Sequence, residues 1–166
     1  KDFVKLGFEI SEKFDTPVMV RSVTRISHAK GIVELQDPVI PPVPIEIKKD
    51  TAKYTMLPSY ARIRHAFIEE RLLKLKEFAE QFPGNRMEIN DSTIGIISAG
   101  ISYQYAKEVY PNYSYLKLGL IWPLPKNLIG EFFKKVKKVY IVEELDPFLE
   151  ETIRAMGFKP KGGKNL

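Results

Sequence analysis

Three strongly apolar runs recur along the second half of the chain. They are Thr93–Ser98, Ser114–Leu120 and Val139–Glu143. Each run is bounded by turn residues and has the length of a β-strand rather than that of a helix. Because apolar residues occupy most positions in these runs, we expect strands that are covered on both faces, as in parallel sheets.

Helical patterns fill the intervals between the runs. Ser102 is a suitable N-cap for a helix over Tyr103–Tyr110, and Pro125 suits the first turn of a second helix. A third helix is expected after Asp146, with Gly157 available to end it in left-handed geometry. Strand–helix–strand connections are right-handed and place helices on both faces of a sheet. The pattern therefore predicts a three-layer α/β/α domain with a mostly parallel sheet.

The first half of the chain has fewer regular elements. Val4 and Phe8 begin an apolar stripe at helical spacing, and Val18–Val20 reads as a short buried strand. Prolines punctuate residues 29–60, which predicts a connector, and Ser59–Phe82 then predicts a long helix that Pro83 and the residues after it end.

The expected strand at residues 18–20 has no partner in the pattern of this half. A single strand cannot satisfy its backbone groups or bury both faces. We therefore expect the chain to come from a longer polypeptide that extends upstream of Lys1.

Composition narrows the possible chemistry. The 166 residues, 44% of them hydrophobic, suffice for one domain with a core, or for one domain and a fragment. Cysteine is absent, which excludes disulfides and thiolate ligands within these residues. The net charge of +5 is interpreted as a lysine-rich surface, and the composition fits a heat-adapted organism. No signal peptide or membrane span is visible, which favours the cytoplasm.

Several short motifs, in consistent order, resemble one family. They are Thr-Pro-Val-Met-Val-Arg at 16–21, Thr-Arg-Ile-Ser-His at 24–28, Leu-Pro-Ser-Tyr-Ala-Arg at 57–62, Gly-Ile-Ser-Tyr-Gln-Tyr at 100–105, Leu-Lys-Leu-Gly at 116–119, Pro-Leu-Pro at 123–125 and Val-Glu-Glu-Leu-Asp-Pro at 142–147. Together they resemble thiamine-diphosphate-dependent 2-oxoacid:ferredoxin oxidoreductases, and in particular the large (alpha) subunits of indolepyruvate ferredoxin oxidoreductases. The resemblance covers nearly the whole chain.

The resemblance implies a division into three parts. Residues 1–28 are expected to be the C-terminal remnant of a pyrimidine-binding domain, and residues 29–85 a linker and its helix. Residues 86–166 are expected to be a domain like the transketolase C-terminal domain, with a five-stranded mixed sheet. In that fold one edge strand is antiparallel, for which Arg86–Asn90 is the candidate, and Phe158–Lys161 is the candidate last strand.

The same resemblance implies an activity for the whole enzyme. Indolepyruvate or another aryl pyruvate would be oxidatively decarboxylated to an acyl-CoA, with electrons passed to ferredoxin. Thiamine diphosphate, Mg²⁺ and iron–sulfur clusters would be the cofactors, bound outside this chain. The expected partners are the remaining domains of the subunit, a second (beta) subunit and ferredoxin, in a homo- or hetero-oligomer without nucleic acid or membrane. The isolated chain, which has no catalytic, cofactor or metal residues of its own in this interpretation, is expected to be inactive.

One segment is a candidate for substrate contact. Arg21, Thr24, Arg25 and His28 follow the expected strand at 18–20. Ligands of open α/β sheets bind beyond the carboxyl ends of strands, and arginine pairs bidentately with carboxylates. In transketolase-like pyrimidine domains a similarly placed arginine helps to hold an anionic substrate. The alternative is that these residues pair with a nearby acid or with connector backbone.

Other polar positions have structural explanations. The turn Ser98–Ser102 offers backbone N–H groups at a helix start, but it lacks the phosphate-binding glycine patterns, so a tight turn is preferred. Glu143, Glu144 and Asp146 are expected to cap helices or form ion pairs rather than bind a metal. A second class of function, a basic α/β module that binds nucleotides or nucleic acid, remains open because of the net charge.

Overall fold

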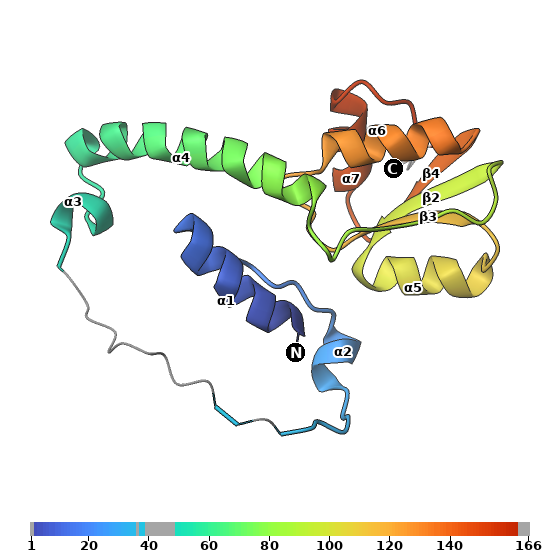
Figure 1. Ribbon diagram of the computed structural model, residues 1–166, viewed down its shortest axis with the longest axis horizontal. Helices are drawn as coiled ribbons and strands as arrows, with labels where there is room; N and C mark the ends of the chain where they lie inside the picture. Colours follow the sequence, from blue (N-terminus) through green and yellow to red (C-terminus); the bar gives the residue numbers. More distant parts are fainter. Residues whose placement is uncertain (1, 36, 39–48, 163–166) are drawn as a thin grey trace. The chain divides into compact units, whose positions relative to one another are not determined.

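The computed structural model describes residues 2–35, 37–38 and 49–162, and the chain divides into two compact units, residues 1–71 and residues 72–166. Figure 1 shows a sheet with helices on both faces in the second unit, and helices and connecting segments in the first. We describe each unit by itself.

The second unit contains a four-stranded mixed sheet. Its strands are β1 (Arg86–Glu88), β2 (Ile94–Ala99), β3 (Ser114–Leu118) and β4 (Lys138–Val142), in the spatial order β1-β3-β2-β4. β2 lies in the centre and pairs in parallel with both β3 and β4, as expected for its apolar run, and β1 pairs antiparallel with β3. The fold class and the antiparallel edge strand are confirmed.

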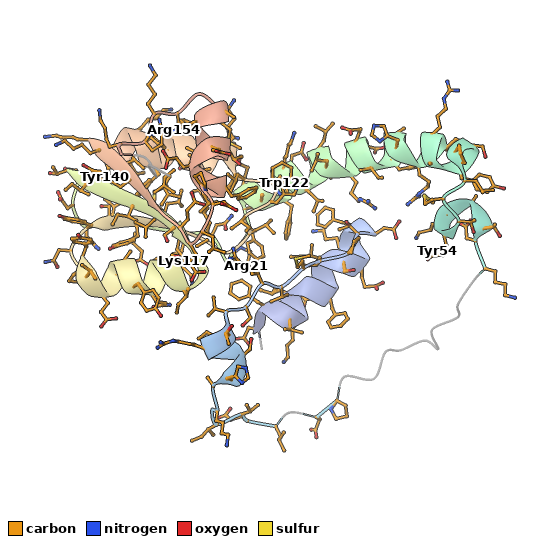
Figure 2. All side chains as sticks on the ribbon, turned by 180° about the vertical axis from the view of Figure 1, so that it is seen from behind. Arg21, Tyr54, Lys117, Trp122, Tyr140 and Arg154 are labelled. Atoms are coloured by element: carbon orange, nitrogen blue, oxygen red, sulfur yellow. The ribbon has the colours of Figure 1, made fainter. Side chains whose placement is uncertain are left out.

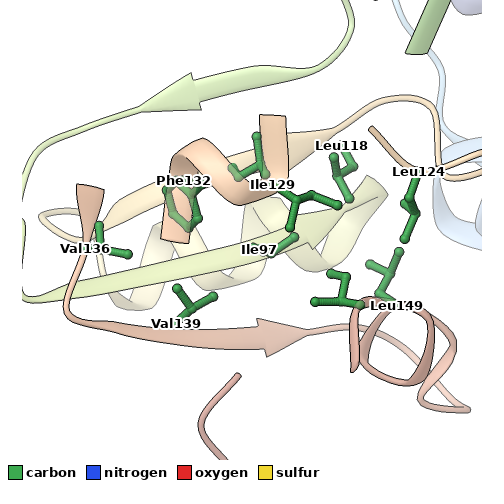
Figure 3. Close-up of a cluster of buried hydrophobic side chains, with 10 residues drawn as sticks. Ile97, Leu118, Leu124, Ile129, Phe132, Val136, Val139 and Leu149 are labelled. Atoms are coloured by element: carbon green, nitrogen blue, oxygen red, sulfur yellow. The ribbon is translucent and has the colours of Figure 1, made fainter. Parts of the chain in front are cut away.

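Three helices cover the sheet of the second unit. α5 (Gly100–Val109) lies on one face, while α6 (Lys126–Lys135) and α7 (Phe148–Ala155) lie on the other (Figure 1). Successive side chains of β2 point to opposite faces of the sheet and so contribute to two cores. Ile97 faces α6 and α7, whereas Ile96 packs with Tyr103 of α5. Figure 3 shows the larger core, in which Ile97, Ile129 and Phe132 are completely buried.

The predicted fifth strand is reduced to one bridge. Residues 158–162 follow α7, and only Lys161 pairs with the sheet, in a parallel bridge to Tyr140. Its N–H donates to the carbonyl oxygen of Val139 at 2.6 Å. The described residues therefore form four strands instead of five, because the chain meets the outer edge of β4 at a single position.

The first unit contains α1 (Asp2–Phe14), α2 (Thr24–His28), α3 (Thr51–Tyr54) and the greater part of α4 (Pro58–Glu80), whose last residues belong to the second unit. The predicted N-terminal helix is confirmed, and the long helix predicted at 59–82 is confirmed with a start one residue earlier and an end two residues earlier. Short helices at 24–28 and 51–54 occur where the sequence suggested loop and connector.

The predicted strand at Val18–Val20 is wrong for this chain. The segment is not paired with any strand among the described residues, and Met19 is 93% exposed. It passes along α1 instead, since a Cβ placed on Gly7 would lie 3.5 Å from side-chain atoms of both Val18 and Val20. Without a neighbouring strand, an apolar β-like sequence has no hydrogen-bonding partner and stays extended but unpaired.

Candidate functional site

The sequence predicts that the segment from Arg21 to His28 contacts the substrate. Thr24, Arg25 and His28 lie on the five-residue helix α2, just after Arg21, and all four residues are exposed. The helix is held locally, since the Ser27 N–H donates to the Val23 carbonyl and the Ser27 hydroxyl lies 3.1 Å from that of Ser22. Among the described residues, no acid pairs with Arg25 or His28. Pairing with a nearby acid, the alternative to substrate contact, is therefore not seen for these two side chains. Their contact with substrate stays a prediction.

A hollow of about 390 Å³ lies in the same unit, around the end of α1. Asp15, in left-handed geometry with φ of 50°, ends this helix. Its carboxylate accepts a hydrogen bond from Lys53 Nζ at 2.6 Å and lies 3.5 Å from Arg64 Nη2, while Arg71 Nη1 donates to its carbonyl oxygen. The hydrogen bond from Lys53 lowers the pKa of Asp15 below its usual value, with a smaller effect from Arg64.

The charged side chains around this hollow connect helices to one another, and they do not form a vacant anion-binding site. Two carboxylates, those of Glu12 and Asp15, line the hollow and balance two of the three positive charges of Lys53, Arg64 and Arg71. These contacts link the end of α1 to α3 and to α4. Because the Asp15 side chain is 56% exposed, its ion pairs contribute little to stability.

A denser polar cluster lies in the second unit, on the α5 face of the sheet. Glu88 of β1 accepts hydrogen bonds from Lys107 Nζ at 2.7 Å, from the Tyr103 hydroxyl at 2.7 Å and from Arg86 Nε at 2.8 Å. Arg86 Nη2 also donates to the Tyr103 hydroxyl oxygen at 3.0 Å. Lys117 of β3 places its ammonium group 5.3 Å from the centre of the Tyr103 ring.

Electrostatics distinguish this cluster from the rest of the surface. Burial alone would raise the pKa of Glu88, but hydrogen bonds from Lys107, Tyr103 and Arg86 outweigh it and lower that pKa to about 2. Glu88 is therefore ionised at neutral pH. Next to it, burial raises the pKa of Tyr115 to about 12, and its hydroxyl donates to the carbonyl oxygens of Ala106 and Tyr110.

The strand-to-helix turn at residues 98–102 has a structural explanation, as expected, but with a different detail. Gly100 adopts a φ of +56° and already begins α5, so Ser102 lies buried inside the helix and is not its N-cap. The N-cap position is Ala99, which has no side chain able to accept a hydrogen bond. Ser98 is also buried, and its hydroxyl donates to the Val142 carbonyl oxygen at 2.6 Å.

Two glutamates cap helices. Glu143, which follows β4, accepts from the N–H groups of Leu149 and Glu150 at 2.8 and 3.0 Å at the start of α7, as the sequence suggested. Glu80, near the end of α4, accepts from the N–H groups of Asn127 and Leu128 at the start of α6, both at 2.9 Å. The second cap was missed because its partners lie 47 and 48 residues away and leave no local signal.

The described residues contain neither a grouped set of metal ligands nor a helix suited to a membrane. Within residues 2–35, 37–38 and 49–162, no group of three or more histidine, cysteine, aspartate or glutamate side chains is placed to hold a metal ion. None of the helices in that part of the chain combines the length and apolar character needed to cross a bilayer.

Comparison with known proteins connects the chain to a class of enzyme. No family model matches it. Over nearly its whole length, however, the chain is similar to one segment of the subunits of an oxidoreductase that acts on a 2-oxoacid. These relatives are indolepyruvate oxidoreductase subunits named IorA, and the resemblance found in the motifs is thereby confirmed.

The similarity is spread along the chain but covers only part of each relative. The Archaeoglobus fulgidus subunit is 40% identical over 169 residues, covering 99% of this chain. The Thermococcus kodakarensis subunit is 37% identical and covers all of it, and that of Methanothermobacter thermautotrophicus is 30% identical and covers 93%. The chain spans 26–28% of the length of these relatives and therefore corresponds to about a quarter of such a subunit.

One solved structure is also similar. It is a 2-oxoglutarate:ferredoxin oxidoreductase from Magnetococcus marinus, with 2-oxoglutarate, coenzyme A and succinyl-CoA bound. The likeness covers 63% of this chain and 20% of that one, with a TM-score of 0.48 and 20% sequence identity.

Proposed function

We propose that the chain is the scaffold and assembly part of an oxidoreductase that decarboxylates indolepyruvate, or a related aryl pyruvate, to an acyl-CoA with electrons passed to ferredoxin. The observation that supports this is the 30–40% identity to IorA subunits over 93–100% of the chain. In this proposal the enzyme works in the cytoplasm as an oligomer with a second subunit.

The side chains that are present bear on which parts of the enzyme bind its cofactors. The chain has no cysteine, so it cannot hold an iron–sulfur cluster through thiolates. Among the described residues, no three or more histidine, aspartate or glutamate side chains are grouped to hold a metal ion. In this proposal thiamine diphosphate, Mg²⁺ and the clusters are bound by other parts of the enzyme.

The domain assignment belongs to the same proposal. Residues 1–28 are assigned to the end of a pyrimidine-binding domain, residues 29–85 to a linker with its helix, and residues 86–166 to a transketolase C-terminal-like domain. The parallel strands β2, β3 and β4 with the antiparallel β1 support the last assignment. The exposed apolar residues along α1, including Phe8 at 71%, support the first, because such surface is normally covered by a neighbouring domain.

The chain by itself provides the first test. We expect no indolepyruvate-dependent reduction of ferredoxin and no binding of thiamine diphosphate in a fluorescence titration. Turnover by the isolated chain would overturn the assignment of the chemistry to other parts. Tight DNA binding that weakens steeply with salt would instead support a basic nucleic-acid-binding module.

The substrate-side segment is tested in the complete enzyme. Arg25→Ala is expected to raise the KM for indolepyruvate about tenfold, the effect of losing one charge-assisted hydrogen bond. Lys135→Ala on α6 removes an exposed charge far along the sequence and serves as the control. Unchanged KM and kcat in Arg25→Ala would remove Arg21, Thr24, Arg25 and His28 from the proposed substrate contact.

A further inference from the structure

The cluster around Tyr103 carries more positive charge than its fold requires. Arg86, Lys107 and Lys117 surround one carboxylate, Glu88. In the described part of the chain, no other carboxylate forms an ion pair with any of these three cations. Lys117 forms none at all, so two positive charges remain unbalanced.

The strand register concentrates that charge. Arg86 and Lys117 occupy directly opposite positions of the antiparallel β1–β3 pair, an arrangement of like charges that destabilises a sheet. Both head groups lie near the same aromatic ring, 5.9 and 5.3 Å from the centre of Tyr103. Glu88 accounts for the positions of Arg86 and Lys107, but it does not account for Lys117.

The cationic groups of Arg86, Lys107 and Lys117 are held in place and remain accessible to a ligand. Glu88 and the Tyr103 hydroxyl hold Arg86 through Nε and Nη2, and no residue in the described ranges accepts from its Nη1. Lys107 uses one of its three donors on Glu88, and its side chain remains 31% exposed. Arg86 is 59% exposed, and Lys117, the fourth of the five residues of β3, is half-buried (Figure 2).

We propose that Arg86, Lys107 and Lys117 form a binding site for the phosphate group of a phosphorylated small molecule. A phosphate monoester carries a charge of about −1.5 to −2 at pH 7, which matches the two unbalanced positive charges, whereas one carboxylate matches only half of them. The guanidinium offers a fork of donors and the two ammonium groups act as point charges, the combination used for phosphate in proteins. Tyr103 fixes the spacing between Arg86 and Lys117.

The test is a titration of the 166-residue chain at constant ionic strength, with backbone amide shifts of β1, β3 and α5 as the signal. Inorganic phosphate and adenosine 5′-monophosphate are the phosphate probes, and acetate is the carboxylate probe. We expect saturable shifts with both phosphates, and binding of acetate at least about tenfold weaker, in line with the lower charge. Extra affinity of the nucleotide would identify an organic phosphate as the ligand, and equal affinity would restrict recognition to the phosphate group.

Lys117→Gln separates the site from general surface charge. This lysine forms no ion pair with any described residue, so the variant keeps the Glu88 network, and we expect phosphate affinity to fall about tenfold. Lys135→Gln on α6, on the opposite face of the sheet, makes the same change of charge and should alter the affinity less than twofold. The proposal is overturned by unsaturable shifts, by equal binding of acetate, or by equal effects of the two variants.

Discussion

The two units of the chain use apolar residues in different ways. The second unit covers both faces of its sheet, and ten buried side chains form the core between the sheet and α6 and α7. In the described part of the first unit only Gly7 and Ile10 are buried, while Phe8, Met19 and Phe67 are among many large apolar residues left exposed. An apolar pattern thus predicts elements in both units, but it predicts burial only where the covering elements are present in the same chain.

The largest expected difference comes from removing one ring in each unit. Phe132→Ala should destabilise the second unit by about 3–5 kcal/mol, because the completely buried ring would leave a cavity. Phe8→Ala, at a ring that is 71% exposed, should change the free energy of unfolding by less than about 0.5 kcal/mol. Urea unfolding followed by the fluorescence of Trp122, the single tryptophan, reports on the second unit, and circular dichroism reports on both. Similar losses for the two variants would contradict the comparison.

A glycine-to-alanine pair tests packing by addition. A Cβ on Gly95 would lie 2.6 Å from Phe132 Cζ and 2.8 Å from Val136 Cγ2, so Gly95→Ala should cost about 1–3 kcal/mol through overpacking. A Cβ on Gly31 in the first unit would meet nothing within 4 Å. Gly31→Ala is therefore expected to be neutral or slightly stabilising in thermal unfolding, and a neutral Gly95→Ala would show that the core is looser than the structure indicates.

Acid should affect the second unit through Glu88. Its pKa falls from 4.5 to about 2 on folding, so its stabilising contribution is present above pH 4.5 and is lost as the pH decreases from there towards 2. We expect this contribution to be about 1–2 kcal/mol, and to be missing in Glu88→Gln. The measurement is the difference between the two proteins in unfolding free energy at pH 5 and pH 2.5.

The matched variant in the first unit is Asp15→Asn. The pKa of Asp15 is also lowered, chiefly by Lys53, but this carboxylate is mostly exposed. Asp15→Asn should therefore change the pH dependence of the unfolding free energy less than Glu88→Gln does. A larger change would show that the ion pairs of Asp15 are better shielded from water than its exposure suggests.

Helix caps give the smallest expected contrast. Glu143→Ala removes the acceptor for two N–H groups at the start of α7 and should cost about 1 kcal/mol in unfolding free energy. Asp50→Ala removes the single cap bond to Lys53 N–H of the four-residue helix α3, and should cost less in the same urea titration. Amide hydrogen exchange at Leu149 and Glu150 would locate the first effect, and unaltered protection there would argue against the cap.

The sequence predicts most of the second unit because its signals are local. Near-continuous apolar runs identify β2, β3 and β4, and Gly157 at a φ of +96° ends α7 as expected. The start of α5 was misplaced because Ser102 looks like a cap, while Gly100 supplies the turn by its backbone geometry. The fifth strand was predicted in full, but pairing depends on the contact between Lys161 and the β4 edge, which no local pattern describes.

The polar sites were harder to predict. The Glu88 cluster joins residues of β1, β3 and α5 that are up to 31 positions apart, and each of them separately reads as an ordinary surface charge. Register is what brings Arg86 opposite Lys117, and register follows from the strand pairing rather than from any motif. By contrast, Glu143 was predicted to cap a helix or form an ion pair, because it lies only a few residues before the helix that it caps.

The single bridge at Lys161 also bears on how the molecule avoids self-association. β4 is an edge strand, and an unpaired edge is a template for the strands of other molecules. The hydrogen bond from Lys161 to Val139 occupies part of that template, and the positive charge of the same residue discourages a second sheet from approaching. Residues 158–162 therefore protect part of the β4 edge from pairing with strands of other molecules, and their removal would expose that edge to such pairing.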